Sequence, residues 1–475
     1  MTLRLLDRAV WVSLLTMMLA GCCGITLLLC HVTVPSWILP AAAIVALVVP
    51  RRITIPPMAP ANRVVLTAAV LVVLLVAAAL AYGALSTDSR HWDGAVAWDA
   101  KAARLTTLAT LEQPWFRDPD VYCHSRDYPL LQPLLMSLLE RLLGCGRVLF
   151  PLAFLLTASV IGLAVRRRTS PLPALLATAA FAVTPNLVNP TSGAFDSGYA
   201  DGLLTMTVAV AVAGIVARDR AWLLIGCLLM VLVKPEGLFY GGALVAATWV
   251  SGNSKLLPAA TAGWLAGCVL QLSLQHDLQT FGASAAWLPI LAMAIAIAAL
   301  LLGSDRWLGS SAIGLRRRRW IAVLGVPTML VAGPLLLLLL TDNPGTFATY
   351  LSDPGRALSR ISSIPSIVIG GVNHGITRGA FGLTWLLPPL LWWLARRRPP
   401  CATTRLLGGI CLLFAAIWML PFLLSPIGDL ERHLRSTLPR LLDHGTGVAW
   451  LLTALLWHRL SSNAGDDTGP NPMTS

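Results

Sequence analysis

The segment from His91 to Asp127 concentrates ionisable side chains within an otherwise apolar sequence, with long runs of Leu, Val and Ala on either side. Because a charged side chain is costly inside a bilayer, we expect this segment to lie in water at one membrane face. A carboxylate held there could act as a general base toward an acceptor hydroxyl. This pattern favours an enzyme that works on lipid-linked or surface substrates. The ionisable residues of the segment include Asp93, Asp99, Lys101, Arg104, Glu112, Arg117, Asp118, Asp120, His124, Arg126 and Asp127.

Asp93 is the leading candidate for the base because it follows directly after a predicted membrane span. The alternative is a solvated loop acid or a helix cap. Asp99 is six residues further on, a spacing that does not place two side chains on one helical face, so we do not treat the two acids as a paired site. Asp99 is the reserve candidate for the base. Trp92 and Trp98 fit the aromatic belt of a membrane interface.

The composition is that of a polytopic membrane protein. Hydrophobic residues make up 56% of the chain, charged residues only 12%, and the mean hydropathy is +0.73. A soluble protein carries about 25% charged residues. The net charge of +13 comes mostly from arginines beside apolar runs, so we interpret it as membrane topology rather than nucleic-acid binding. The sequence contains no G-x-x-x-x-G-K-[ST] motif, which argues against an ATP-driven pump.

We predict an all-α bundle of about fourteen spans, using the criterion of about 20 apolar residues per span. Two further helices are expected in the first large outer loop: an amphipathic helix over 128–144 on the outer interface and a short one over 97–108. Treating 128–144 as a span would place Arg166, Arg167 and Arg168 outside, against the positive-inside rule. The predicted spans are 9–30, 35–50, 64–85, 148–165, 171–189, 202–217, 221–234, 236–251, 256–275, 283–303, 320–340, 379–395, 404–424 and 438–458.

The arginines predict the sidedness of these spans. With the N-terminus inside, each predicted cytoplasmic connection is basic. Both termini are then cytoplasmic, in what we expect to be a bacterial plasma (inner) membrane. We divide the chain into two N-terminal helices (1–62), a catalytic membrane module (63–460) and a disordered tail (461–475). Beyond a short first turn, the predicted outer loops are 86–147, 190–201, 234–236, 276–282, 341–378 and 425–437.

Other ionisable residues lie at predicted span boundaries. Lys234 is costly at membrane depth and could bind an anion, or it could form a helix-tip pair with Glu236. Asp201 could serve a site or simply cap its helix. Arg432 and His433 could bind phosphate or snorkel to the interface. The remaining candidates are in the first loop: His124, Asp127 and Tyr128 could bind an acceptor or a metal, and Cys123 could pair with Cys145.

Five segments together resemble GT-C-type membrane glycosyltransferases, which include protein mannosyltransferases and lipid A aminoarabinose transferases. The similarity covers roughly residues 60–460, and the matches come in family order. Two predicted spans precede the first matching loop, and no large C-terminal soluble domain is seen, so the resemblance does not define a subfamily or an acceptor. The segments are WDGAVAWDAKAARL (92–105), HSRDYPLLQPLL (124–135), FDSGYADGLL (195–204), VKPEGL (233–238) and ERHLRSTLP (431–439).

The resemblance implies an inverting, single-displacement transfer of a sugar from a polyprenyl-phosphate donor at the outer face. Asp93 would be the base. No cofactor is indicated, and dependence on a divalent metal stays open. The partners would be the donor, membrane lipids and an acceptor glycan, glycolipid or protein, with no nucleic acid. The implied phosphate-binding residues are Lys101, Lys234, Arg432 and His433, and the implied acceptor- or sugar-binding residues are His124, Asp127, Tyr128, Asp201 and Glu236.

Two other functions fit a polytopic chain. A secondary transporter or lipid-linked sugar flippase should place ionisable or helix-breaking residues within its spans. We expect the spans here to be almost entirely apolar, which favours the transferase. A polysaccharide polymerase or ligase would have its main loop late in the sequence, whereas the longest polar loop here is early.

Overall fold

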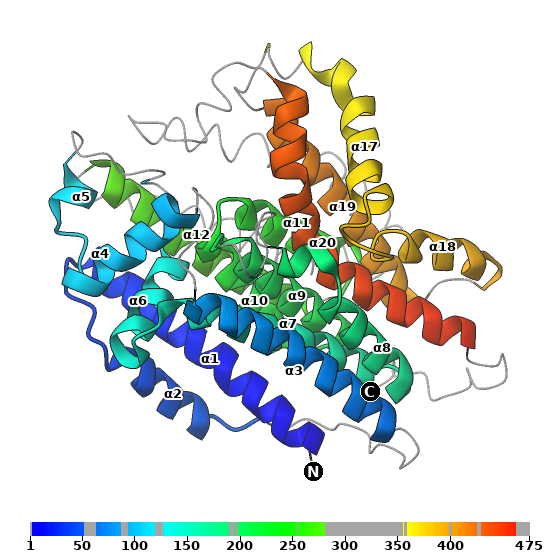
Figure 1. Ribbon diagram of the computed structural model, residues 1–475, viewed down its shortest axis with the longest axis horizontal. Coiled ribbons are helices and arrows are strands. Elements are labelled where there is room, and N and C mark those ends of the chain that lie inside the picture. The colour runs from blue at the N-terminus through cyan, green and yellow to red at the C-terminus, as the bar shows by residue number, and fades with distance from the viewer. Residues whose placement is uncertain are drawn as a thin grey trace.

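The computed structural model describes residues 2–51, 63–86, 94–118, 126, 128–189, 195, 198–253, 255–280, 355, 359–398, 401–424 and 429–461. Within these ranges the chain forms sixteen α-helices and no β-strand (Figure 1). The all-α prediction is confirmed for this part of the chain. The helices are α1 (Thr2–Leu29), α2 (Ile38–Val48), α3 (Arg63–Ser86), α4 (Ala100–Leu108), α5 (Pro114–Arg117), α6 (Leu131–Leu143), α7 (Leu149–Arg166), α8 (Pro171–Ala182), α9 (Asp201–Ala217), α10 (Arg220–Val233), α11 (Glu236–Val250), α12 (Leu257–Thr280), α17 (Ile364–Val372), α18 (Leu387–Leu394), α19 (Ala402–Leu424) and α20 (Leu430–Ser461).

Helix α9 forms the centre of the bundle. It packs against α7, α10 and α20, and every residue from Asp201 to Val216 is buried. Its 17 residues rise about 25 Å, which is shorter than a hydrocarbon core of about 30 Å. Because α9 is enclosed by other helices, its apolar side chains pack against protein rather than against lipid. This explains why its sequence is apolar all round instead of amphipathic.

Several helices are long and apolar enough to cross a membrane, so the chain is a helical membrane protein. Five described helices meet this criterion, and the shorter apolar helices are α2, α8, α9 and α10. The described structure does not reach the predicted fourteen spans; predicted spans 283–303 and 320–340 lie outside it. The five long apolar segments are Leu3–Leu29, Val64–Ser86, Gly146–Arg166, Leu257–Gln275 and Ala402–Leu424.

Two predicted boundaries near the C-terminus are wrong. The span predicted over 379–395 is helical only from Leu387 as α18, because Gly379 and Gly382 adopt positive φ in the preceding turns. The outer loop predicted over 425–437 is helical from Leu430 onward, since α20 continues through Pro439. Most of the predicted tail, 462–475, lies outside the described residues.

The helix predicted over 128–144 is present as α6 but is not a surface helix. Residues Leu131 to Leu139 are all buried, and only its last turn exposes large apolar side chains. Gly21 and Gly24 of α1 allow this packing, because a Cβ at these positions would lie 2.4 and 2.6 Å from methyl carbons of Leu131 and Leu134. Helix α4, with the π-helical turn Gly94–Asp99 before it, accounts for the helix predicted over 97–108.

One cluster of alternating charges ties together the ends of four helical segments. Arg51 binds Asp7 at 3.0 Å and Asp219 at 2.8 Å, and Arg167 binds the same carboxylates at 2.6 and 3.1 Å. Both guanidinium groups lie over the Trp222 ring. These residues come from α1, the end of α2, the end of α7 and the start of α10. Three of the connections predicted to be cytoplasmic are therefore brought together.

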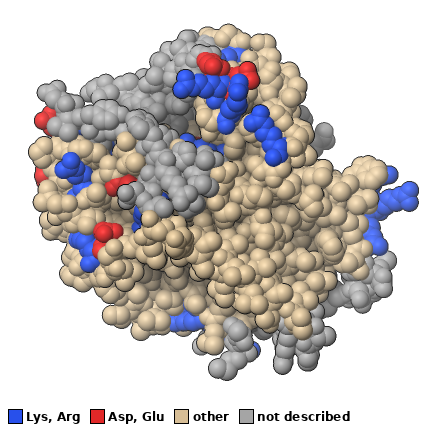
Figure 2. Space-filling model, in the orientation of Figure 1, with Lys and Arg blue, Asp and Glu red and all other residues tan. Residues whose placement is uncertain are grey.

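A second cluster joins segments predicted to lie on the other side. Arg117 binds Asp277 of α12 at 2.9 Å, Glu112 at 2.8 Å and the His31 ring, just after α1, at 2.9 Å. On the face drawn in Figure 2, charged side chains of the described residues gather near the edges and leave a broad uncharged surface between them. This distribution fits a protein whose middle is surrounded by lipid.

Candidate functional site

The main buried polar site is centred on Asp201, the first residue of α9. One carboxylate oxygen is 2.6 Å from Lys234 Nζ and 2.7 Å from His444 Nε2, and the other is 3.0 Å from Arg440 Nε. The Asp201 and His444 side chains are completely buried. We call Asp201, Lys234, Arg440 and His444 the Asp201 cluster. Its two cations compensate a carboxylate that would otherwise be very costly to bury.

A tight turn between α10 and α11 positions Lys234. Lys234 has an extended backbone, as expected before Pro235, and Glu236 begins the next helix. Gly237 is required here because a Cβ would lie 1.8 Å from the Met230 carbonyl oxygen. The predicted turn at 234–236 is thus confirmed. The turn carries Lys234 to Asp201, while Glu236 lies 3.4 Å from the same ammonium group.

Helix α20 contributes the other two members of the cluster. Arg440 and His444 are four residues apart and share one face of the helix. The guanidinium of Arg440 lies 3.9 Å above the Tyr199 ring, which covers it from the segment before α9. Gly445 and Gly447 allow close approach, since a Cβ at either position would lie within 3 Å of Trp418, Trp385 or Ala209.

A directional chain of hydrogen bonds extends from Asp201 into the bundle. An ionised carboxylate only accepts, so His444 donates from Nε2 to Asp201. Trp418 Nε1 donates to the Tyr240 hydroxyl at 2.9 Å, and this hydroxyl lies 3.0 Å from His444 Nδ1. If His444 is neutral, its Nε2 donates to Asp201 and its Nδ1 accepts from the Tyr240 hydroxyl, so each ring nitrogen has a partner. The arrangement fixes the ring that orients Asp201.

Asp443 forms a separate contact on the neighbouring side of α20. Its two oxygens lie 2.8 and 2.9 Å from Asn186 Nδ2, and the carboxylate is fully buried. The Asn186 backbone N–H in turn donates to the Ala380 carbonyl at 2.7 Å. A second ionisable group thus lies at the depth of the Asp201 cluster.

The structure brings together only some of the residues predicted from the sequence. Asp201, Lys234 and Glu236 lie together, and the Asp201 carboxylate pairs with side chains instead of capping α9. Lys234 contacts Glu236 but is closer to Asp201, so the helix-tip pair is only part of its environment. Asp93, His124 and Asp127 lie outside the described residues. Their roles stay predictions.

Lys101 is another predicted phosphate-binding residue, and it lies on α4. It is completely buried, with its ammonium group 5.9 Å from the centre of the Trp98 ring and 5.8 Å from that of Tyr128. Just after Tyr128, Gln132 of α6 donates to the Gly198 carbonyl, three residues before Asp201. Asp99 is the last residue of the π-helical turn before α4. The first loop therefore contacts the segment just before Asp201 through α6.

Arg432 and His433 are about two to three turns before the cluster on α20 and are not part of it. Arg432 is exposed, whereas His433 is buried and its ring packs edge-on against Phe422. Burial, reinforced by the charge of Arg360, lowers the pKa of His433 to about 4. His433 is therefore neutral near pH 7 and is a poor phosphate-binding cation.

Sequence reasoning missed Arg440, Asp443 and His444. We expected the span 438–458 to be apolar, and the structure corrects this expectation: all three lie in or at its first turns, with Asp443 and His444 fully buried. The sequence could have indicated these residues. Lys234 was selected because a charge at membrane depth is costly, and the same argument applies to Arg440, Asp443 and His444. Tyr240 and Trp418 gave no signal because isolated aromatic residues are common in apolar helices.

Neither a metal site nor a disulfide is seen among the described residues. No group of three or more His, Cys, Asp or Glu side chains within them is arranged to hold a metal ion. Cys145 is a free cysteine, and its predicted partner Cys123 lies outside the described residues. No protein-family model matches the chain, and no curated protein sequence matches it significantly.

Proposed function

We propose that the protein is a membrane glycosyltransferase that uses a polyprenyl-phosphate sugar and binds the lipid phosphate at the Asp201 cluster. The observation that carries this proposal is the pairing of Lys234 and Arg440 on one buried carboxylate. With His444 neutral, the charges of Lys234 and Arg440 balance those of Asp201 and Glu236, so the partly exposed Arg440 guanidinium is the group that we assign to the phosphate. Arg440 retains 20% side-chain exposure, so the cluster reaches the protein surface.

The position of the cluster supports an outer-face reaction. Asp201 and Lys234 lie at one end of α9 and α10, and Asp219 joins the arginine-rich cluster at the other end. The positive-inside rule assigns that arginine-rich end to the cytoplasm. The Asp201 end is then outside, next to the acid-rich first loop. We place both termini in the cytoplasm on the same basis.

The proposed reaction is a single displacement. The acceptor oxygen attacks the anomeric carbon while the bond from that carbon to the phosphate oxygen breaks. The acceptor proton passes to the Asp93 carboxylate, and the bonding electron pair leaves with the lipid phosphate. Lys234 and Arg440 stabilise the charge on this leaving group. We assign Glu236, beside Lys234, to sugar hydroxyls.

The test measures release of polyprenyl phosphate by the purified full-length protein from a panel of polyprenyl-phosphate hexoses and pentoses, with a crude envelope fraction as the acceptor source. We expect release with at least one donor. Asp93→Asn should abolish it, and Arg440→Gln should reduce it at least tenfold. Arg435→Gln is the matched control, since Arg435 is exposed and forms an i,i+4 pair with Glu431. Equal activity of Asp93→Asn and the wild type would contradict the proposed base.

A specific observation favours transport as the second candidate function. Asp443 and His444 are buried within a predicted span, where ionisable groups often form proton pathways. A proton-coupled transporter reconstituted in liposomes should acidify or alkalinise the lumen when its solute is added, and Asp443→Asn should stop this. Donor-dependent release of polyprenyl phosphate without proton movement would instead support the transferase.

A further inference from the structure

The charges around Arg117 do not balance as long as His31 is neutral. We call His31, Glu112, Arg117 and Asp277 the Arg117 cluster. Its single guanidinium lies 2.8 Å from the Glu112 carboxylate and 2.9 Å from the Asp277 carboxylate. These described residues therefore sum to one negative charge. A proton on the His31 ring would make the cluster neutral.

The Nδ1 atom of His31 has two neighbours that require opposite protonation states. It lies 2.9 Å from an Arg117 nitrogen and 2.6 Å from Glu112 Oε1. An unprotonated Nδ1 can only accept, so it bonds Arg117, whereas a protonated Nδ1 can only donate, so it bonds Glu112. The other ring nitrogen, Nε2, lies 3.6 Å from Asp277 Oδ1. In the imidazolium form both ring nitrogens are donors, and each faces a carboxylate.

The end of α1 also favours a positive charge on this ring. His31 has a φ of 57°, its N–H donates to the Leu28 carbonyl, and the next N–H donates to the Leu27 carbonyl. This is a Schellman motif, whose left-handed position is usually glycine. The histidine places its ring beside the C-terminal carbonyls of α1. Cations are stabilised at this end of a helix.

We propose that protonation of His31 strengthens the attachment of the first loop to α1 and α12. The groups that face the ring are Glu112 and Arg117 of the first loop and Asp277 of α12. Helix α6 adds Arg141, which donates to the backbone three residues after His31. Because histidine ordinarily titrates between about pH 5 and 8, the attachment becomes stronger as the pH falls through this range. The inference does not depend on the proposed transferase reaction.

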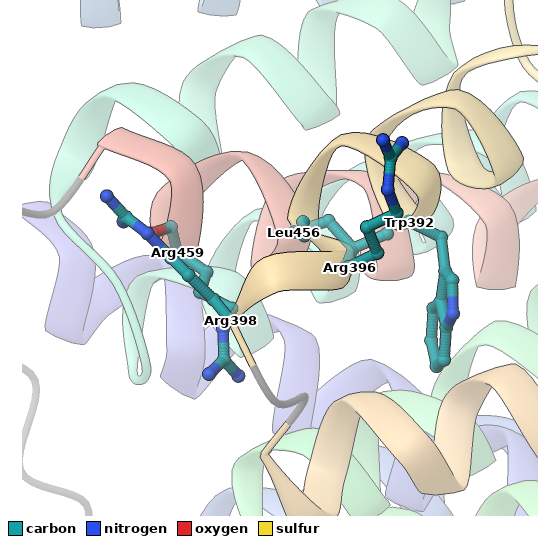
Figure 3. Close-up of a pocket in the computed structure, with 6 residues that line it drawn as sticks. Trp392, Arg396, Arg398, Leu456 and Arg459 are labelled. Atoms are coloured by element: carbon teal, nitrogen blue, oxygen red, sulfur yellow. The ribbon is translucent and has the colours of Figure 1, made fainter.

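The test measures hydrogen exchange of the full-length protein in detergent by mass spectrometry, at about pH 5.5 and pH 7.5. The readout is the protection factor of residues 110–118, corrected for the intrinsic effect of pH on exchange. Exchange of the buried helix α9, measured in the same spectra, separates a local change from a change in global stability. His31→Asn is the test variant, because asparagine tolerates the left-handed backbone but does not titrate. His458→Asn is the matched control, since His458 is next to Arg459 in the last turn of α20 (Figure 3).

We expect protection of residues 110–118 in the wild type to be about threefold higher at the lower pH, the size typical of partly exposed ion pairs. The control should behave like the wild type, and His31→Asn should show equal protection at the two pH values. Glu112→Gln should also reduce the pH effect, because it removes the carboxylate that Nδ1–H would bond. A pH effect that persists in His31→Asn would assign it to another group and overturn the proposal. Equal or lower protection of the wild type at the lower pH would also overturn it.

Discussion

At the scale of single residues, the Asp201 carboxylate is the shared hydrogen-bond acceptor of three buried or partly buried side chains. It accepts from an ammonium, a guanidinium and an imidazole, and it is fully buried. In such a site, removal of one partner leaves an uncompensated charge, which costs more than the intact pair contributes. The variants below separate the structural and chemical roles of the cluster.

Asp201→Asn should lower the free energy of unfolding by about 3–5 kcal/mol, because Lys234 and Arg440 would then be buried beside a neutral amide. The double variant Asp201→Asn/Lys234→Met should recover part of this loss, since it removes one of the two cations that have lost the Asp201 carboxylate. Unfolding in mixed micelles measures both values. Additive losses in the double variant would show that the two residues do not interact.

His433 should make stability depend on pH on the acid side. Its pKa is lowered to about 4 in the folded protein by burial and by Arg360, from an ordinary value of 6.5. Between these pH values the unfolded chain binds more protons at His433 than the folded protein does. The free energy of unfolding therefore decreases as the pH falls from about 6.5 to 4. His433→Leu should flatten the melting temperature over this pH range. An unchanged slope in this variant would mean that another group titrates.

At the scale of helices and turns, sequence patterns predicted where helices lie along the chain better than they predicted which helices contact one another. Apolar runs located α3, α7 and α19 nearly to their ends, because a long apolar segment has few alternatives to a helix in lipid. Helix α1 begins at Thr2, well before the predicted start at residue 9. The burial of α6 could not be predicted. Its amphipathic pattern is the same whether its apolar face meets lipid or α1. Likewise, the pairing of Asp201 with Arg440 joins residues 239 positions apart, and nothing local specifies it.

Gly237→Ala should disrupt the α10–α11 turn and with it the position of Lys234. The added methyl would lie 1.8 Å from the Met230 carbonyl oxygen, a contact that requires backbone movement. We expect a loss of monodisperse protein in size-exclusion chromatography. Gly409→Ala is the control, because no atom lies within 4 Å of the Cβ it would add to α19. It should leave the elution profile unchanged, since alanine favours a helix over glycine.

At the scale of the whole molecule, the two ends of the bundle have different charge chemistry. Arg51 and Arg167 alternate with two carboxylates at one end, and α9 separates them from Asp201 at the other. The proposed transferase requires the Asp201 end to face outward, where a flipped donor lipid would be available. Sidedness is therefore the property on which the largest part of the functional proposal rests.

A labelling experiment decides the sidedness. In a background with all nine native cysteines replaced by alanine, we would introduce Arg435→Cys at the exposed start of α20 and, separately, Arg396→Cys near its end. A membrane-impermeant maleimide should label the first in intact cells and the second only after permeabilisation, because they lie near opposite ends of α20 and the positive-inside rule assigns the Arg396 end to the cytoplasm. The reverse pattern would place the Asp201 cluster in the cytoplasm. An outer-leaflet donor could then not reach Lys234 and Arg440, and a reaction with a cytoplasmic donor would have to replace it.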